Sequence, residues 1–274
     1  MKPTYILPLL VLGSSVMIFG CTKKHEEVDL SGIHTTAAVR ETMAPTTAAV
    51  EVTSSAPTEA SQEVDGSALN VSAAVETFKD TSHGSVSIQY PVVSNLSDSK
   101  TQEEVNRLLL ANATAIIGSI TAEDSVTIDI SCKVISVDRS RLTAVYKGTM
   151  QVQGSPYPTN VFYTNTVDLK QVQSLGFNDY SDAYTMAGYV MSDDVQFYQS
   201  TADLNQALLS HRAAMSVEQY TQLFDQADFP LSSTEDGFFP ESFSYTHEGV
   251  LYFSIPVPHP LGDYAIVTFN IDGK

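Results

Sequence analysis

The sequence is poor in basic residues for its size. Its 274 residues contain 14 Lys and Arg against 32 Asp and Glu, and the formal net charge is −18. Residues 83–274 alone contain 22 acidic and 9 basic residues. Nucleic-acid binding requires a basic surface for the phosphates, so nucleic acid is excluded as a partner. The acidic charge would attract a cationic partner, and it would equally serve the solubility of an extracellular protein.

The sequence also lacks the motifs that mark common active sites. It has no HExxH or HxH pair, no P-loop, no dinucleotide-binding glycine pattern and no nucleophile elbow. The acidic pairs Glu123-Asp124, Asp193-Asp194 and Glu235-Asp236 suit glycoside hydrolysis or Ca²⁺ binding, but such pairs at turns are more often simply solvated. We therefore expect no enzymatic activity, no cofactor and no metal. The alternative is a cell-wall glycan hydrolase or deacetylase that uses acidic residues or His259.

Only two cysteines occur, and the first lies at the end of a short apolar run. Met1-Lys2 is a minimal basic start, and Tyr5 to Phe19 is too short to span a hydrocarbon core of ~30 Å comfortably. A short apolar run followed by Gly20-Cys21 is typical of a bacterial lipoprotein signal peptide. Residues 1–20 are therefore the predicted signal peptide, and Cys21 carries the lipid, with palmitate-type chains. An ordinary secretion signal or an uncleaved anchor is the alternative, and either also leads out of the cytoplasm.

The second cysteine, Cys132, belongs to an apolar strand face with Val126, Ile128, Ile130 and Val134. A buried and inert thiol is the usual occupant of such a position. Since Cys21 is assigned to the lipid, no internal disulfide is expected.

Residues 21–82 have almost no aromatic side chains. None occurs between Phe19 and Phe78, and Thr35-Thr-Ala-Ala-Val39 recurs as Thr46-Thr-Ala-Ala-Val50. Such a Thr-, Ala-, Ser- and Glu-rich segment buries too little apolar area to offset its ordering entropy. It is predicted to be a disordered linker whose ends lie roughly 40 Å apart. A lipid tether of this kind would hold the following domain on the extracytoplasmic face of the cell membrane.

Apolar periodicity predicts an α+β domain over residues 83–274, with an antiparallel or mixed sheet, helices packed on one face, and the disordered stalk before it. A strand over 85–90, ended by Pro91, precedes a helix whose capping box is Thr101 and Glu104. Three strands then form an antiparallel meander, helices follow, and a hairpin and a last strand close the chain. The predicted strands are 126–137, 142–152, 160–169, 242–245, 249–255 and 264–271, and the predicted helices are 101–120, 181–191, 201–210 and 216–224.

Several short patterns along residues 84–272 carry a family resemblance. They are the Tyr90-Pro91 strand, the helix with Val105-Asn106, Gly148, the segment from Gly154 to Asn160, Asp168-Leu169, and Phe243-x-Tyr245 with Pro258-x-Pro260-x-Gly262. Together they resemble the extracytoplasmic domain of lysozyme-sensing anti-sigma factors (RsiV-like, DUF3298/DUF4163), which is also found attached to peptidoglycan deacetylases. The resemblance implies a domain that binds rather than reacts, because the deacetylases carry their chemistry in a separate domain.

The chain departs from that pattern in two loops. Tyr157-Pro158 stands where the family often has His-Pro, and Lys170 replaces the usual glycine after Asp168-Leu169. The partner of the family therefore does not transfer directly to this chain.

Exposed tyrosines are the best candidates for a recognition surface, since they present an apolar ring with a polar tip. We expect Tyr157 and the rigid loop Pro256–Asp263 to be exposed, which makes Tyr157, His259, Asp263 and Tyr264 the candidate partner-binding residues. Core packing is the alternative for the tyrosines, and half of a catalytic triad or a metal ligand is the alternative for His259 with Asp263. The predicted function is a cell-surface lipoprotein that binds an envelope partner, either a cationic protein such as lysozyme or peptidoglycan.

Overall fold

The first sheet has six strands in the order β1-β2-β3-β4-β5-β6. The structure is a computed structural model that describes residues 70–82, 84–121, 125–231 and 238–271, all within one compact unit of residues 63–274. β2 and β3 are parallel and every other neighbouring pair is antiparallel, so the sheet is mixed. The strands are β1 Ser72–Asp80, β2 Gly84–Ser94, β3 Val126–Val137, β4 Arg141–Val152, β5 Thr159–Asp168 and β6 Gln173–Leu175.

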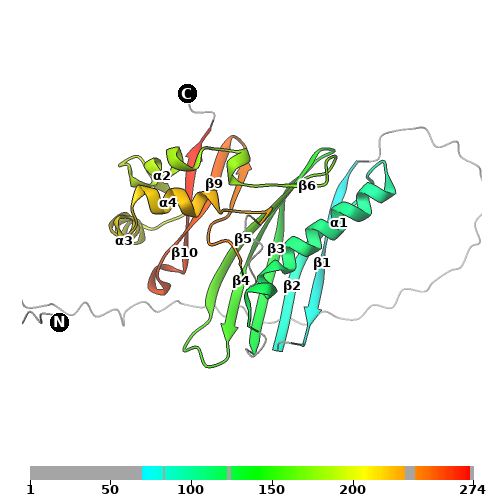
Figure 1. Cartoon of the computed structure of the whole chain (residues 1–274), viewed down its shortest axis with the longest axis horizontal. Coiled ribbons are helices and arrows are strands. Elements are labelled where there is room, and N and C mark those ends of the chain that lie inside the picture. The colour runs from blue at the N-terminus through cyan, green and yellow to red at the C-terminus, as the bar shows by residue number, and fades with distance from the viewer. Residues whose placement is uncertain (1–69, 83, 122–124, 232–237, 272–274) are drawn as a thin grey trace, which may run out of the picture. The chain divides into compact units, whose positions relative to one another are not determined.

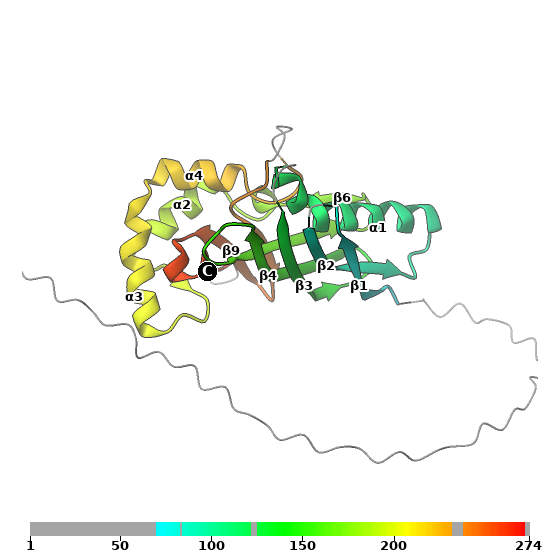
Figure 2. The same cartoon turned by 90° about the horizontal axis from the view of Figure 1, so that it is seen from below.

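Helix α1 (Ser99–Thr114) connects β2 to β3 and covers one face of this sheet (Figures 1 and 2). Its apolar stripe, which includes Val105 and Leu109, is fully buried. The Asn106 side chain donates to Val93 O at 2.9 Å and accepts from Val93 N at 2.7 Å, which ties the helix to the end of β2. A parallel strand pair requires a crossover of this kind.

The second sheet has four strands in the order β7-β10-β9-β8, and three helices cover one of its faces (Figure 1). Alternate residues of β9, such as Leu251 and Phe253, are buried against these helices. The opposite face packs on β4 and β5 of the first sheet, where Tyr245 and Ile266 join the larger core. The elements are β7 Gln196–Phe197, β8 Ser244–His247, β9 Val250–Pro256, β10 Tyr264–Asn270, α2 Ala183–Met191, α3 Ala202–His211 and α4 Val217–Asp225.

A buried carboxyl group connects the two sheets. Asp228 is 1% exposed, and its Oδ1 accepts from Ser244 N at 2.7 Å and from Thr164 Oγ1 at 3.0 Å. The Ser244 hydroxyl also bonds to its Oδ2. Burial raises the pKa of Asp228 to about 7, and the hydrogen bonds from Ser244 and Thr164 oppose that shift.

The predicted α+β class and the antiparallel meander β3-β4-β5 are confirmed, as are α2, α3 and α4. Ser216 and Gln219 form a capping box at the start of α4. The signal peptide, Cys21 and the predicted linker up to residue 69 lie outside the described residues. Among the residues that are described, no helix is both long and apolar enough to cross a bilayer.

The end of the predicted linker is wrong, because Ser72–Asp80 forms β1 and pairs with β2 over its whole length. β1 is an edge strand with mostly exposed side chains, so it shows no apolar alternation in the sequence. Its order comes from ladder hydrogen bonds to β2 and from partial burial of Phe78. Because few side chains of β1 are buried, its sequence has no apolar pattern from which the strand could be predicted.

Two boundaries near β2 also differ from the prediction. β2 continues through Pro91 to Ser94, because beyond Ile88 it pairs only with β1 and an edge position tolerates proline. Helix α1 begins earlier than expected, with Asp98 as the N-cap accepting from Thr101 N at 2.7 Å. The predicted capping box of Thr101 and Glu104 is therefore wrong. The helix ends at Thr114, and a 3₁₀ turn, Ala115–Ser119, follows.

Candidate functional site

Two loops distant in sequence meet beside the second sheet and bring Tyr157 onto His259. Tyr157 lies between β4 and β5, and His259 lies between β9 and β10. Their rings stack with centroids 3.9 Å apart and planes 10° from parallel. Tyr157 nevertheless remains 51% exposed, so one face of its ring is held and the remainder is presented to solvent. We call Tyr157, Asn160, His259 and Asp263 the aromatic anchor.

The Asp263 carboxylate connects the two loops of the anchor. Its carboxylate lies 3.0 and 3.1 Å from His259 Nδ1. Its Oδ2 also accepts from Asn160 N at 2.7 Å and from Asn160 Nδ2 at 3.0 Å. One carboxylate thus connects the imidazole of one loop to the first residues of β5, with its own side chain only 13% exposed.

The local backbone explains this arrangement. Pro258 begins the short 3₁₀ helix η4 (His259–Leu261), and the chain then turns through Gly262 at φ 107° and Asp263 at φ 69°. The turn is closed by the bond from Val257 N to Asp263 O at 3.0 Å. This left-handed pair of residues brings the Asp263 carboxylate back over His259, which a regular strand entry would not do.

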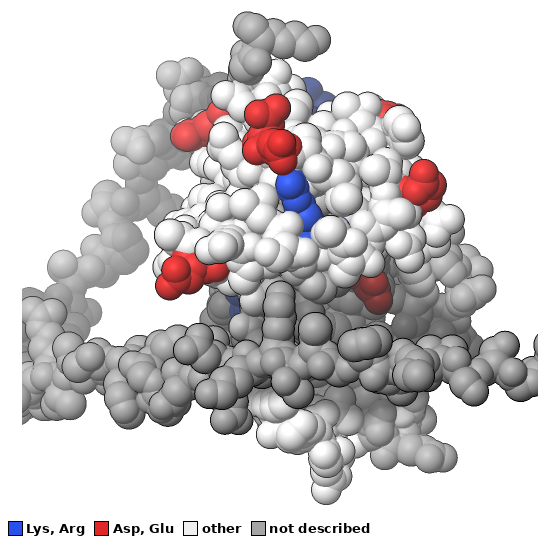
Figure 3. All heavy atoms as spheres, turned by 90° about the vertical axis from the view of Figure 1, so that its left-hand side faces the viewer, with Lys and Arg blue, Asp and Glu red and all other residues white. Residues whose placement is uncertain are grey.

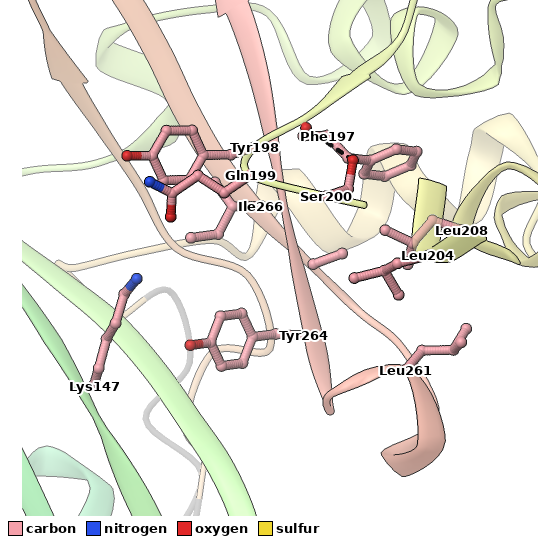
Figure 4. A pocket seen from close by; sticks show the side chains of 11 residues that line it. Lys147, Phe197, Tyr198, Gln199, Ser200, Leu204, Leu208, Leu261, Tyr264 and Ile266 are labelled. Atoms are coloured by element: carbon pink, nitrogen blue, oxygen red, sulfur yellow. Dashed lines mark hydrogen bonds between the residues drawn. The ribbon is translucent and has the colours of Figure 1, made fainter. Parts of the chain in front are cut away.

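Tyr264, the fourth predicted site residue, lies apart from the anchor. Its ring stacks on Phe162 with centroids 5.1 Å apart, and it is half-buried. Burial raises the pKa of its hydroxyl. Tyr264 instead lines a pocket with Lys147 and Tyr198 (Figure 4). The structure therefore brings Tyr157, His259 and Asp263 together, while the ring of Tyr264 stacks on Phe162 and lines the pocket.

The other chemical candidates have ordinary surroundings. Asp193 pairs with Arg212 at 3.4 Å, and His247 lies 3.8 Å from Glu248 at the β8–β9 turn. Burial raises the pKa of the Cys132 thiol to about 12, which suits an inert thiol. Glu123-Asp124, Glu235-Asp236 and His83 lie outside the described residues.

Within the described ranges, no group of three or more His, Cys, Asp and Glu residues is positioned to hold a metal ion. His259 with Asp263 supplies only two ligand types, and Asn160 already uses one carboxylate oxygen. Among the same residues, His259 makes no hydrogen bond to a hydroxyl or thiol group.

The sequence patterns did not reveal the roles of three residues that depend on tertiary contacts. Asn160 bonds to Asp263 across 103 positions, and no spacing rule reveals such a pair. Lys147 is an exposed residue within β4 and resembles any solvated lysine in the sequence. Asp228 sits in the apolar run Ala227-Asp-Phe229, and this flanking was the only available signal of its burial.

No protein-family model and no curated protein sequence matches the chain. Solved structures to which it is similar are DUF3298 family proteins. One, from Bacteroides fragilis, has 13% identity and a TM-score of 0.43, and the match covers 73% of this chain and 89% of that one. Another, from Pseudomonas aeruginosa, has 11% identity and a TM-score of 0.28, with 73% and 95% covered. At these values the likeness carries no inference about the site.

Proposed function

We propose that this chain is an extracytoplasmic recognition protein that binds a cationic protein of the cell envelope. In this proposal a lipid on Cys21 tethers it to the outer face of the membrane, and the folded domain binds without catalysing a reaction. The observation that carries the proposal is the aromatic anchor, in which the Tyr157 ring is 51% exposed yet stacked at 3.9 Å on His259.

An exposed ring with a fixed orientation is a favourable contact for a partner. Tyrosine is enriched among the residues that dominate binding energy, because it buries much area with few rotatable bonds. The Asp263 hydrogen bonds to His259 and Asn160 reduce the entropy that the two loops would lose on binding. The anchor is therefore preorganised before any partner arrives.

The charge beside the anchor favours a basic partner. Residues 171–271 contain 13 acidic residues and one basic residue, Arg212. The Arg212 guanidinium already donates to Val190 O at 3.1 Å, to Ser192 O and to Asp193. Acidic side chains are scattered over the face formed by the helical layer (Figure 3). The exposed acidic residues in or next to α2, α3 and α4 include Asp182, Asp194, Asp203, Glu218 and Asp225.

The anchor adjoins this acidic layer, since η4, which carries His259, contacts α3. A basic protein that docked on Tyr157 would therefore meet acidic side chains at the rim of the contact. Rim charges of this kind raise the association rate and make it sensitive to salt.

Hen lysozyme is a suitable cationic probe, titrated against the domain at low and moderate salt. Tyr157→Ala should weaken binding about tenfold or more, as expected for a central aromatic contact. Tyr184→Ala is the matched control, because Tyr184 is 65% exposed on α2 and outside the anchor. Equal affinities of the two variants for lysozyme would contradict a role of the anchor in binding. An affinity that does not change with salt would contradict the electrostatic part of the proposal.

The tether is tested separately in cells. The full chain should incorporate an alkyne-labelled fatty acid and fractionate with membranes, while Cys21→Ala should lose the label and leave that fraction. A labelled Cys21→Ala protein would contradict lipidation at this residue.

The alternative function, hydrolysis or deacetylation of cell-wall glycan, draws its support from one contact. The Asp263 carboxylate on His259 Nδ1 would orient the imidazole as a base, with Nε2 facing the substrate. This alternative requires release of soluble products or acetate from purified peptidoglycan by the parent protein and loss of that release in His259→Ala.

A further inference from the structure

A second concave site, separate from the aromatic anchor, lies between the two sheets. It is a pocket of about 500 Å³ that combines tyrosines of the second sheet with lysines of the first. A smaller pocket of about 160 Å³ shares Lys147, Tyr198 and Gln199 with it, so the two are continuous around these residues (Figure 4). We call the joined space the tyrosine groove; its principal residues are Lys133, Lys147, Tyr198, Gln199, Tyr245, Tyr252 and Tyr264.

The groove exists because the second sheet covers only part of the first. Val145 and Phe162, on the covered face of β4 and β5, are buried. Lys133 on β3 lies opposite Val145, and Lys147 lies opposite Ser131, so both lysines belong to this same face. They lie beyond the covered area and remain exposed.

One wall of the groove is aromatic. Tyr252 stacks on Tyr245 with centroids 4.7 Å apart, and Tyr198 meets Tyr252 edge-on at 5.4 Å. Tyr198 is 40% exposed, an unusual fraction for a ring already engaged in a cluster. Burial raises the pKa of the Tyr245 and Tyr252 hydroxyls, so both remain protonated donors at neutral pH.

The other wall of the groove is basic. Lys147 Nζ lies 5.8 Å from the centroid of the Phe162 ring, and no ion pair to either Lys133 or Lys147 occurs among the described residues. Partial burial lowers the pKa of Lys147, and the nearby Lys133 lowers it further. The carboxylate of Glu248, at the rim, is directed to His247. An anion in the groove would relieve the repulsion between the lysines.

We propose that the tyrosine groove binds a saccharide that carries a carboxylate. A pyranose ring has an apolar C–H face that matches an exposed tyrosine ring and a hydroxyl rim that matches phenol and amide groups. Figure 4 places the Lys147 ammonium, the Gln199 amide and the Tyr264 hydroxyl around one space. The lysines supply the positive charge that a carboxylate requires. This is the usual composition of a ligand site, an apolar wall with a few placed polar groups.

The test uses two oligosaccharides that share a sugar backbone and differ in the lactyl ethers that carry the charge. The tetrasaccharide of alternating N-acetylglucosamine and N-acetylmuramic acid carries lactyl carboxylates, whereas chitotetraose has the same sugar backbone without them. In calorimetric titrations of the folded domain we expect the acidic probe to bind about tenfold or more tightly than the neutral one. Lys147→Met should abolish this preference, and Tyr198→Ala should weaken both probes. Lys100→Met, an exposed lysine on α1, is the matched control and should change neither.

Equal affinity for the two probes, no binding of either, or an unchanged preference in Lys147→Met would overturn the proposal. The side chains of Lys147 and Tyr198 are both exposed, so neither substitution should unfold the protein. Circular dichroism of each variant checks that the fold is retained. Tyr157→Ala should bind both probes like the parent, because the anchor and the groove are different sites. A failure of saccharide binding would therefore not contradict the proposed binding of a cationic protein. A failure of protein binding would likewise not contradict the saccharide proposal.

Discussion

The two halves of the folded chain carry very different charges. Residues 70–170, which supply the first five strands and α1, contain ten acidic and eight basic residues, whereas residues 171–271 contain thirteen and one. Residues 70–271 have a net charge of −14, and −12 of it belongs to residues 171–271, which contain the helical layer and the second sheet. The eight basic residues of residues 70–170 are divided between the first sheet, α1 and the turns, and two of them, Lys133 and Lys147, form one wall of the tyrosine groove.

This difference in charge between the two halves shows that one domain can have two surfaces of different charge. The acidic layer beside the anchor suits a basic macromolecule, while the groove suits a small anionic ligand. A uniformly acidic surface would be explained by solubility alone. The uneven distribution supports surfaces with distinct partners, and the following predictions test how separate the two halves are.

The largest effect is expected from Phe253→Ala, in the core of the second half. Phe253 is 0% exposed and contacts Phe177 and Phe224 edge-on at 5.5 and 5.2 Å. Its truncation should reduce the unfolding free energy by about 3–5 kcal/mol. Because Asp228 bonds to both sheets, circular dichroism and tyrosine fluorescence should give one common transition in urea. Two separate transitions, with only one shifted, would indicate that the halves fold independently.

A comparable effect, limited to a pH window, is expected from Asp228. Its pKa rises from 3.8 when unfolded to about 7 when folded, so the folded state holds an extra proton between about pH 4 and pH 7. The unfolding free energy should therefore fall as pH rises through this window, by about 4 kcal/mol at most. Denaturation at several pH values should reveal the slope in the parent. Asp228→Asn should flatten it, and an unchanged slope would assign it to another group.

A smaller effect concerns the charge of the second half directly. The triple variant Asp194→Asn, Asp203→Asn and Asp225→Asn should slow association with lysozyme about tenfold at low salt. The matched variant Glu103→Gln, Glu104→Gln and Asp129→Asn removes the same charge from the first half. Stopped-flow measurements should show little change for this control. Equal slowing of both would mean that net charge, rather than its location, governs association.

The smallest effect is expected at the start of α4. The Ser216 side chain accepts from Gln219 N at 3.3 Å, and the Gln219 side chain accepts from Ser216 N at 2.8 Å. Ser216→Ala should lower the unfolding free energy by about 1 kcal/mol, since it leaves one N–H of the helix start unsatisfied. Ser216→Asp retains an acceptor and should remain near the parent in thermal melts. A loss of equal size in both variants would exclude capping as the cause.

Elements that bury a regular stripe were predictable. β3, β4 and the helices α2–α4 have the apolar spacing of their secondary structure, so their types and approximate bounds followed from it. β1 was missed because its stability comes from pairing with β2 rather than from its own side chains. Pro91 was read as a strand end because a proline is harmless only at an edge, and edge status is a property of the assembled sheet.

The candidate site divides in the same way. The expected exposure of Tyr157 is confirmed, whereas in the loop Pro256–Asp263 only Pro258 and Pro260 are exposed. Partner binding by these residues stays a prediction. Their contact with each other, and the Asn160 bonds that hold Asp263, join positions about a hundred residues apart. The groove pairs Lys147 of one sheet with Tyr198 near the edge of another, and neither residue has a local feature that distinguishes it.

The sequence by itself determined the secondary structure of the well-buried elements, the excess of acidic residues and the residue types at both loops, because each depends on neighbours along the chain. Only the tertiary structure decided that Tyr157 stacks on His259, that Asp228 joins the sheets, and that Lys133 and Lys147 line a groove with tyrosines of the second sheet. These depend on how two sheets pack, and packing brings together residues whose separation along the chain contains no information about their distance in space.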